Sequence, residues 1–121
     1  MKDNVVVDKS YAFSIRVIKA HKHLNDNKKT ILSNQFLRSG TAISALAHEA
    51  VHAQSRKDFI NKMNIALKEA NETRYWIKLF YENGYINDAS FNSIIGDCNE
   101  LICILASIVK TTKNNTPDAA K

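Results

Sequence analysis

Apolar residues recur at three- and four-residue spacing along almost the whole chain, and this pattern constrains the fold more than any other feature. Helix-breaking residues are scarce, because only 3 glycines and 1 proline occur among 121 residues. A chain of this length fits one domain, residues 1–121, with an ordered core over about residues 8–112 and a flexible tail over 113–121. We therefore expect a single all-α domain.

Breaks in the apolar pattern divide the chain into four predicted helices. They run over about residues 8–25, from Thr30 to before Ser55, over about 56–83, and from Asn87 or Asp88 to about 112. Ser55 is followed three residues later by an acid, which is close to a capping box, and Gly84 can end the third helix. The short connections force antiparallel neighbours, so the expected fold is an up-down-up-down antiparallel four-helix bundle.

The predicted helices differ in how clearly they show an inner face. The second helix has one narrow stripe, made of Phe36, Gly40, Ile43, Ala47 and Ala50. The first helix has a broader one, made of Tyr11, Ser14, Ile15, Val17, Ile18, His21 and Leu24. A glycine costs about 1 kcal/mol of helix stability relative to alanine, so we expect Gly40 to pack closely against a neighbouring backbone.

The positive charge of the chain is concentrated in one segment. Residues 9–29 contain six lysines and arginines and a single acid, Asp26, a balance of 6 − 1 = +5 that equals the net charge of the whole chain. No acid interrupts the basic stripe on the first helix, so RNA or DNA is a natural partner and a solubilising face is the alternative. The candidate nucleic-acid-binding residues are Lys9, Arg16, Lys19, Lys22, His23, Lys28 and Lys29.

A second surface, on the predicted second and third helices, is unusually apolar for a solvent face. On a helical wheel its residues fall away from the inner stripes. They are Arg38, Thr41, Ala42, Ala45, Glu49, His52, Ile65, Glu69, Glu72 and Trp76. Such a mixture is typical of a subunit interface, so we expect a homo-oligomer rather than a monomer in which Trp76 covers the edge of the bundle.

Within this surface Arg38 is expected to find a carboxylate partner. The candidates are Glu49 on its own helix, and Glu69 or Glu72 across an interface. A solvated arginine is the alternative.

Residues 48–52, HEAVH, match the HExxH pattern of zinc metallopeptidases, in which two histidines bind zinc and the glutamate acts on its bound water. Glu72 is a conceivable third ligand. No strand is predicted that could hold a peptide substrate, so His48 and His52 are interpreted as packing or hydrogen-bonding residues, and zinc binding or hydrolysis is kept as a remote alternative.

No other pattern in the sequence indicates an enzyme. We predict no catalytic residue and no cofactor, and Cys98 is expected to face the core. Cys98 and Cys103 point apart on one predicted helix, so both are expected to be reduced thiols. Neither a signal peptide nor a membrane span is recognised, so we expect a cytoplasmic protein without a membrane partner.

Four segments together carry a family resemblance. They are residues 10–13, SYAF; residues 37–43, LRSGTAI; Glu49-Ala50 followed by residues 53–59, AQSRKDF; and residues 66–76, ALKEANETRYW. As a set they resemble the four-helix-bundle proteins encoded in 23S ribosomal RNA intervening sequences, over about residues 8–112.

The resemblance implies a ring, a homopentamer similar to the accessory variability protein of diversity-generating retroelements, which binds nucleic acid through a basic surface. The family pattern does not require histidine at positions 48 and 52, and the chain departs from it at Ser44 and Leu46. The leading functional hypothesis is a non-enzymatic oligomer that contacts RNA or DNA through its first helix. The alternative is a scaffold for a protein partner.

Overall fold

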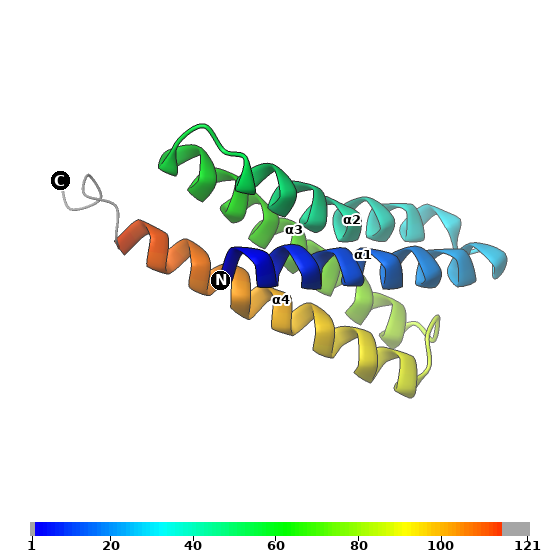
Figure 1. Cartoon of the computed structure of the whole chain (residues 1–121). Helices are drawn as coiled ribbons and strands as arrows, with labels where there is room; N and C mark the ends of the chain where they lie inside the picture. The colour runs from blue at the N-terminus through cyan, green and yellow to red at the C-terminus, as the bar shows by residue number, and fades with distance from the viewer. Residues whose placement is uncertain (1, 115–121) are drawn as a thin grey trace.

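Four long helices make up nearly all of residues 2–114, the part of the chain that the computed structural model describes, with side chains from residue 5 onward (Figure 1). They are α1 (Lys2–Asp26), α2 (Thr30–Val51), α3 (Arg56–Glu82) and α4 (Asp88–Asn114). Successive helices run in opposite directions (Figure 1). The predicted all-α, up-down-up-down bundle is therefore confirmed.

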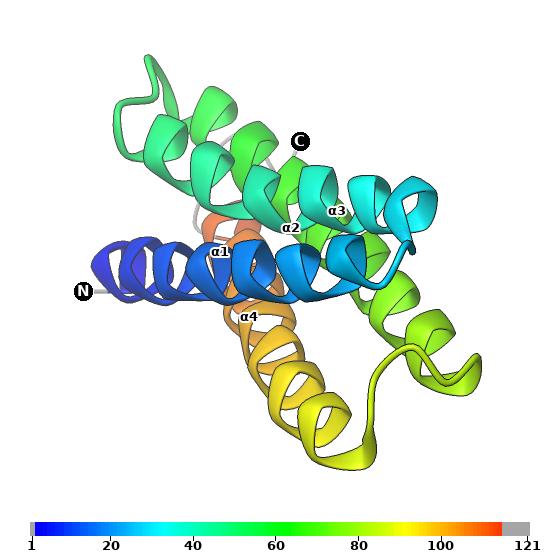
Figure 2. The ribbon, with the colours of Figure 1, turned by 90° about the vertical axis from the view of Figure 1, so that its right-hand side faces the viewer.

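The helices pack in a closed order, in which α1 contacts α2, α2 contacts α3, α3 contacts α4, and α4 returns to α1. The last of these contacts is the least extensive. Figure 2 shows why, because the N-terminal half of α4 diverges from the C-terminal half of α1. The bundle is consequently tight on three sides and looser between its first and last helices.

The ends of the helices follow local capping chemistry. The Ser55 hydroxyl accepts a hydrogen bond from the Asp58 amide at 3.0 Å, as the sequence predicts for the start of α3. Gly84 follows the end of α3 with φ of 75°, a conformation that suits glycine. Asn87 caps α4 by accepting from the Ser90 amide at 2.8 Å.

Two boundaries differ from the expectation. Helix α1 begins at Lys2 rather than near residue 8, because Val6 is fully buried and extends the core by a further turn. Helix α4 continues to Asn114, so Lys113 belongs to the helix rather than to the predicted tail. Residues 115–121 lie outside the described residues.

The predicted inner stripe of α2 is confirmed, since Phe36, Gly40, Ile43, Ala47 and Ala50 are all buried. Aromatic side chains link the helices within this core. The rings of Phe36 and Phe80 meet edge to face at 5.6 Å between centroids, and Phe80 stacks on Tyr85 at 5.7 Å.

The predicted inner face of α1 is partly wrong. Val17 and Leu24 are buried as expected, but Tyr11, Ile15 and Ile18 are 59%, 42% and 52% exposed. Apolar residues occupy two sides of α1, and only one side can pack between α2 and α4. The buried side is set by Val6, Ser10, Phe13, Ser14, Val17 and Leu24.

Gly40 of α2 packs closely against Val17 of α1. A Cβ atom at this position would lie 2.8 Å from both Cγ atoms of Val17, closer than carbon atoms pack. Close packing is thus confirmed, although the neighbour is a valine side chain rather than the expected backbone.

Helix α4 is long and apolar enough to cross a membrane by length and composition alone, with mean hydropathy of 1.4 over its most apolar window. The expectation that no segment approaches a membrane span is therefore wrong for this helix. In the bundle its apolar residues Ile94, Leu101 and Leu105 are buried in the core, and 33% of that window is buried.

Candidate nucleic-acid interface and self-association surface

The basic stripe of α1 lies beside acidic residues of α4. Lys9 Nζ lies 3.1 Å from a carboxylate oxygen of Glu100. The Arg16 guanidinium pairs with Asp97 and donates to the Ser93 hydroxyl at 2.8 Å. The stripe is uninterrupted along α1 itself, but α4 neutralises its N-terminal half.

The remaining five candidates form a cluster that we call the cationic end. It comprises Lys19, Lys22, His23, Lys28 and Lys29, all of which are exposed. Among the side chains that the structure describes, those of residues 5–114, no carboxylate lies within ion-pair distance of the three lysines at 19, 22 and 28. Lys29 Nζ lies 4.7 Å from the centre of the Tyr85 ring, a cation–π contact that leaves its charge uncompensated.

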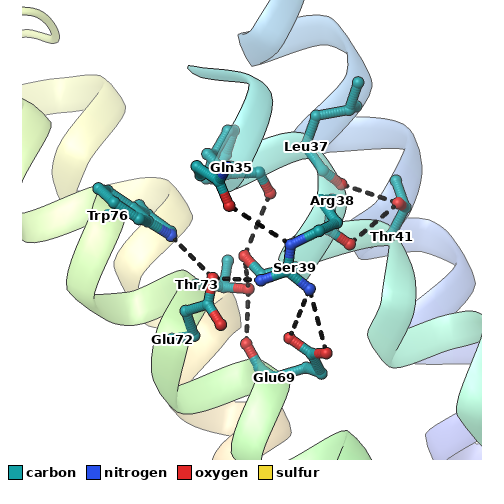
Figure 3. Close-up of polar contacts among 10 residues, drawn as sticks. Gln35, Leu37, Arg38, Ser39, Thr41, Glu69, Glu72, Thr73 and Trp76 are labelled. Atoms are coloured by element: carbon teal, nitrogen blue, oxygen red, sulfur yellow. Dashed lines mark hydrogen bonds and ion pairs between the residues drawn. The ribbon is translucent and has the colours of Figure 1, made fainter. Parts of the chain in front are cut away.

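Arg38 binds two glutamates of the neighbouring helix in the same chain (Figure 3). Its guanidinium lies 3.2 Å from Glu69 and also pairs with Glu72. The Trp76 indole donates to the same Glu72 carboxylate at 3.1 Å. The prediction that these carboxylates reach Arg38 across a subunit interface is therefore wrong, because α2 and α3 pack side by side and bring them together within one chain.

This cluster shifts the pKa of two of its members. The hydrogen bond to Glu72 raises the pKa of Arg38 above its ordinary value. Partial burial raises the pKa of Glu72, but hydrogen bonds from Arg38 and Trp76 outweigh this effect, so the pKa lies below its ordinary value. Both groups are consequently charged at neutral pH, and the cluster fixes α2 against α3.

The expected alternative, a pair between Glu49 and Arg38, is also wrong. Glu49 pairs instead with Lys62 of α3, at 3.1 Å. All ten residues proposed for the self-association surface remain half-buried or exposed in the isolated chain. They are the α2 residues Arg38, Thr41, Ala42, Ala45, Glu49 and His52 and the α3 residues Ile65, Glu69, Glu72 and Trp76, which we call the outer face.

The exposed side of α1 carries further apolar residues. Tyr11, Ile15 and Ile18 follow one another at spacings of four and three, so they form a single line, the α1 stripe. The Tyr11 ring reaches α2 and meets the His48 ring at 6.3 Å between centroids. Sequence reasoning missed the α1 stripe as a surface because its spacing is also that of a core face.

The HEAVH segment is engaged in local packing. The Nδ1 atom of His48 lies 2.8 Å from the Ser44 carbonyl oxygen of the preceding turn. His52 is the C-cap of α2, and Glu49 holds Lys62. Glu72, the conceivable third ligand, is bound by Arg38 and Trp76. Among the described residues, no three His, Cys, Asp or Glu side chains lie together as a metal site would require.

The two cysteines have different environments. Cys98 is fully buried, as predicted, and its Sγ lies 3.4 Å from the Ala70 carbonyl oxygen. Burial raises the pKa of the Cys98 thiol to about 12, so it is uncharged at neutral pH. Cys103 is exposed, and neither cysteine forms a disulfide.

Taken together, the fold and surfaces define an all-α four-helix bundle with one cationic end and a broad outer face. The chain matches the family model of the 23S rRNA-intervening sequence protein over residues 2–107, and it belongs to that family. The resemblance inferred from the four segments is thus confirmed.

A solved structure supports the same assignment. It is the crystal structure of a protein with unknown function from the S23 ribosomal protein family of Bacteroides thetaiotaomicron, to which this chain is 51% identical. The match covers 91% of this chain and 99% of that chain, with a TM-score of 0.87. No curated protein matches the chain significantly.

Proposed function

We propose that this chain is a non-enzymatic, cytoplasmic, self-associating protein that binds RNA or DNA electrostatically through its cationic end. The observation that carries the proposal is the uncompensated charge of that end. Residues 19–29 contain four lysines and one acid, Asp26, a balance of 4 − 1 = +3. Phosphate backbones attract such a cluster regardless of sequence.

Self-association would strengthen this attraction, because each subunit of a ring presents its own cationic end to one polyanion. A homopentamer is the assembly that the family resemblance implies. The outer face and the α1 stripe support self-association, since both expose apolar residues, and the ion pairs of Arg38 on the outer face are already made within the chain. The free cysteines fit a reducing compartment.

The nucleic-acid test is fluorescence anisotropy of labelled single-stranded RNA and DNA at several salt concentrations. We expect affinity that falls steeply with salt. Changing Lys19, Lys22 and Lys28 together to glutamate should reduce the slope of log affinity against log salt by about 2 to 3, because each lysine that neutralises a phosphate adds roughly 0.7 to 0.9 to that slope. Absence of binding at low salt contradicts the proposal.

The control is a triple variant with the same change in net charge elsewhere. Lys57, Lys68 and Lys110 are exposed and lie outside the cationic end, so changing them to glutamate should alter the slope much less. Equal effects of the two triple variants would mean that total charge, and not this surface, governs binding. Changing Lys9 to glutamate should also have a small effect, because Glu100 already compensates its charge.

Self-association is tested by light scattering at micromolar concentration. Ile18→Glu places a charge on the α1 stripe at a position that is 52% exposed, so folding should be preserved while the oligomer dissociates. Ala106→Glu makes a similar change on an exposed position of α4 and should leave the oligomer intact. If light scattering shows that the wild-type chain is a monomer, this part of the proposal is contradicted.

A scaffold for a protein partner is the second candidate, and the α1 stripe favours it. If the chain is oligomeric but shows no affinity for RNA or DNA at low salt, the same surface is better explained as a protein contact.

A further inference from the structure

The N-terminal half of α4 diverges from the C-terminal half of α1 (Figure 2). A cavity of about 360 Å³ is lined there by residues of both helices. Its volume lies within the range of small-molecule sites, about 300 to 1,000 Å³. A second hollow of about 410 Å³ adjoins it at the α3–α4 turn, since both are lined by His23, Ile86 and Ser90. The cavity therefore has an opening to solvent on this side.

The floor of the cavity is hydrocarbon. It is lined by Leu24, Phe36, Ile77, Phe80, Ile86 and Ile94, contributed by all four helices and the α3–α4 turn. Four of these side chains are at most 2% exposed, so the floor is the wall of the core itself. Such a floor favours an apolar ligand body, because it offers no hydrogen-bonding group to a polar one.

The rim of the cavity is cationic and polar. Arg16, Lys19 and His23 of α1 lie along it, with Ser90 of α4 opposite, and none of the described residues that line the cavity is acidic. Arg16 is already bound by Asp97, so its charge is compensated. Lys19 has no carboxylate partner in the described part of the chain. The rim thus offers one free positive charge and two further hydrogen-bonding side chains.

We propose that this cavity binds a small amphipathic anion, a molecule with an apolar body and one carboxylate. The apolar body occupies the hydrocarbon floor, and the carboxylate pairs with the Lys19 ammonium within reach of His23 and Ser90. A nucleobase fits less well, because base edges would face the apolar floor without partners. The inference goes beyond the proposed function, since it concerns a small ligand in a cavity rather than a polyanion on the surface.

Octanoate is the probe, with octanol and acetate as matched compounds that lack the charge and the chain. Titration of the ¹⁵N-labelled protein followed by NMR should show saturable shifts of the Lys19, Ile86 and Ser90 amides with octanoate. Octanol should bind at least about threefold more weakly, because it loses the ion pair, and acetate should produce no saturable shift. Equal binding of octanol and octanoate, or no saturable shift with octanoate, overturns the proposal.

Two variants locate the site. Ala20→Leu adds side-chain volume at the cavity wall without changing charge, and it should weaken octanoate binding by about tenfold or more. Lys19→Ala should weaken it by about threefold to tenfold, whereas Lys22→Ala, three residues along α1 and outside the lining, should leave it unchanged. Circular dichroism confirms that each variant is folded. Wild-type affinity in a folded Ala20→Leu variant would place the ligand elsewhere and refute the assignment.

Discussion

The contact between Gly40 and Val17 allows a quantitative test of how α1 and α2 pack. Replacing a helix-interior glycine by alanine normally stabilises a helix by about 1 kcal/mol. At position 40 the added methyl group would lie 2.8 Å from both Cγ atoms of Val17, and overpacking of this kind costs about 1 to 3 kcal/mol. The Gly40→Ala variant should therefore be less stable than the wild type, by up to about 2 kcal/mol.

Gly96 provides the matched control within the same chain. It lies inside α4, it is exposed, and a Cβ atom there would meet nothing within 4 Å. Gly96→Ala should consequently gain the full helix preference, about 1 kcal/mol. Urea unfolding followed by circular dichroism at 222 nm gives both values.

A double-mutant cycle isolates the contact itself. Val17→Ala removes two buried methyl groups and should cost about 2 kcal/mol or more. In that background the two contacts at 2.8 Å are gone and only the Cβ atom of residue 17, at 3.3 Å, remains close, so Gly40→Ala should be less unfavourable than in the wild type, with a coupling energy of about 1 to 3 kcal/mol. If Gly40→Ala stabilises the wild type as much as Gly96→Ala does, the argument for close packing of α1 on α2 fails.

Three further predictions concern single side chains. Ser39→Ala should destabilise the protein by about 1 kcal/mol, because the Ser39 hydroxyl accepts a buried hydrogen bond from α3. Ser14→Ala should be neutral or stabilising, because the buried Ser14 hydroxyl has no partner among the described residues. Urea unfolding measures the stability of both variants. Cys103 should react with a thiol reagent in the native protein at pH 8, and Cys98 should react only on unfolding, as mass spectrometry of the labelled peptides would show. The pKa of Glu72 in the folded state lies below its unfolded value of about 4.5, so its contribution to stability is complete above pH 4.5 and is lost as the pH falls through the folded value. In urea unfolding, the free energy of unfolding of the Glu72→Gln variant should therefore fall less steeply with decreasing pH than that of the wild type.

The sequence predicts the helices well because their signals are local. The inner stripe of α2 contains the large apolar residues Phe36 and Ile43, whereas the outer-face residues of that helix are small or polar, so one orientation satisfies it. Helix α1 is different, since Tyr11, Ile15 and Ile18 are as apolar as the residues that are buried. The choice between its two sides depends on the approach at Gly40, and periodicity alone cannot resolve it.

The candidate site is only partly predictable for a related reason. Residue type identifies Arg38, Glu69 and Glu72 as partners, but only the packing of α2 on α3 shows that they meet within one chain. The compensation of Lys9 by Glu100 depends on two helices far apart in sequence. The cavity depends on the divergence of α4 from α1, and no short-range pattern encodes an angle between helices.

An even number of alternating helices has a practical consequence for handling this protein. Helix α1 starts and α4 finishes near the α2–α3 connection, whereas the cationic end and the cavity mouth lie near the α1–α2 and α3–α4 turns. A fluorophore attached in the last turn of α4 would accordingly lie at the opposite end of the bundle from the cationic end and the cavity mouth. Immobilisation through that position would leave the cationic end and the cavity mouth accessible to ligands.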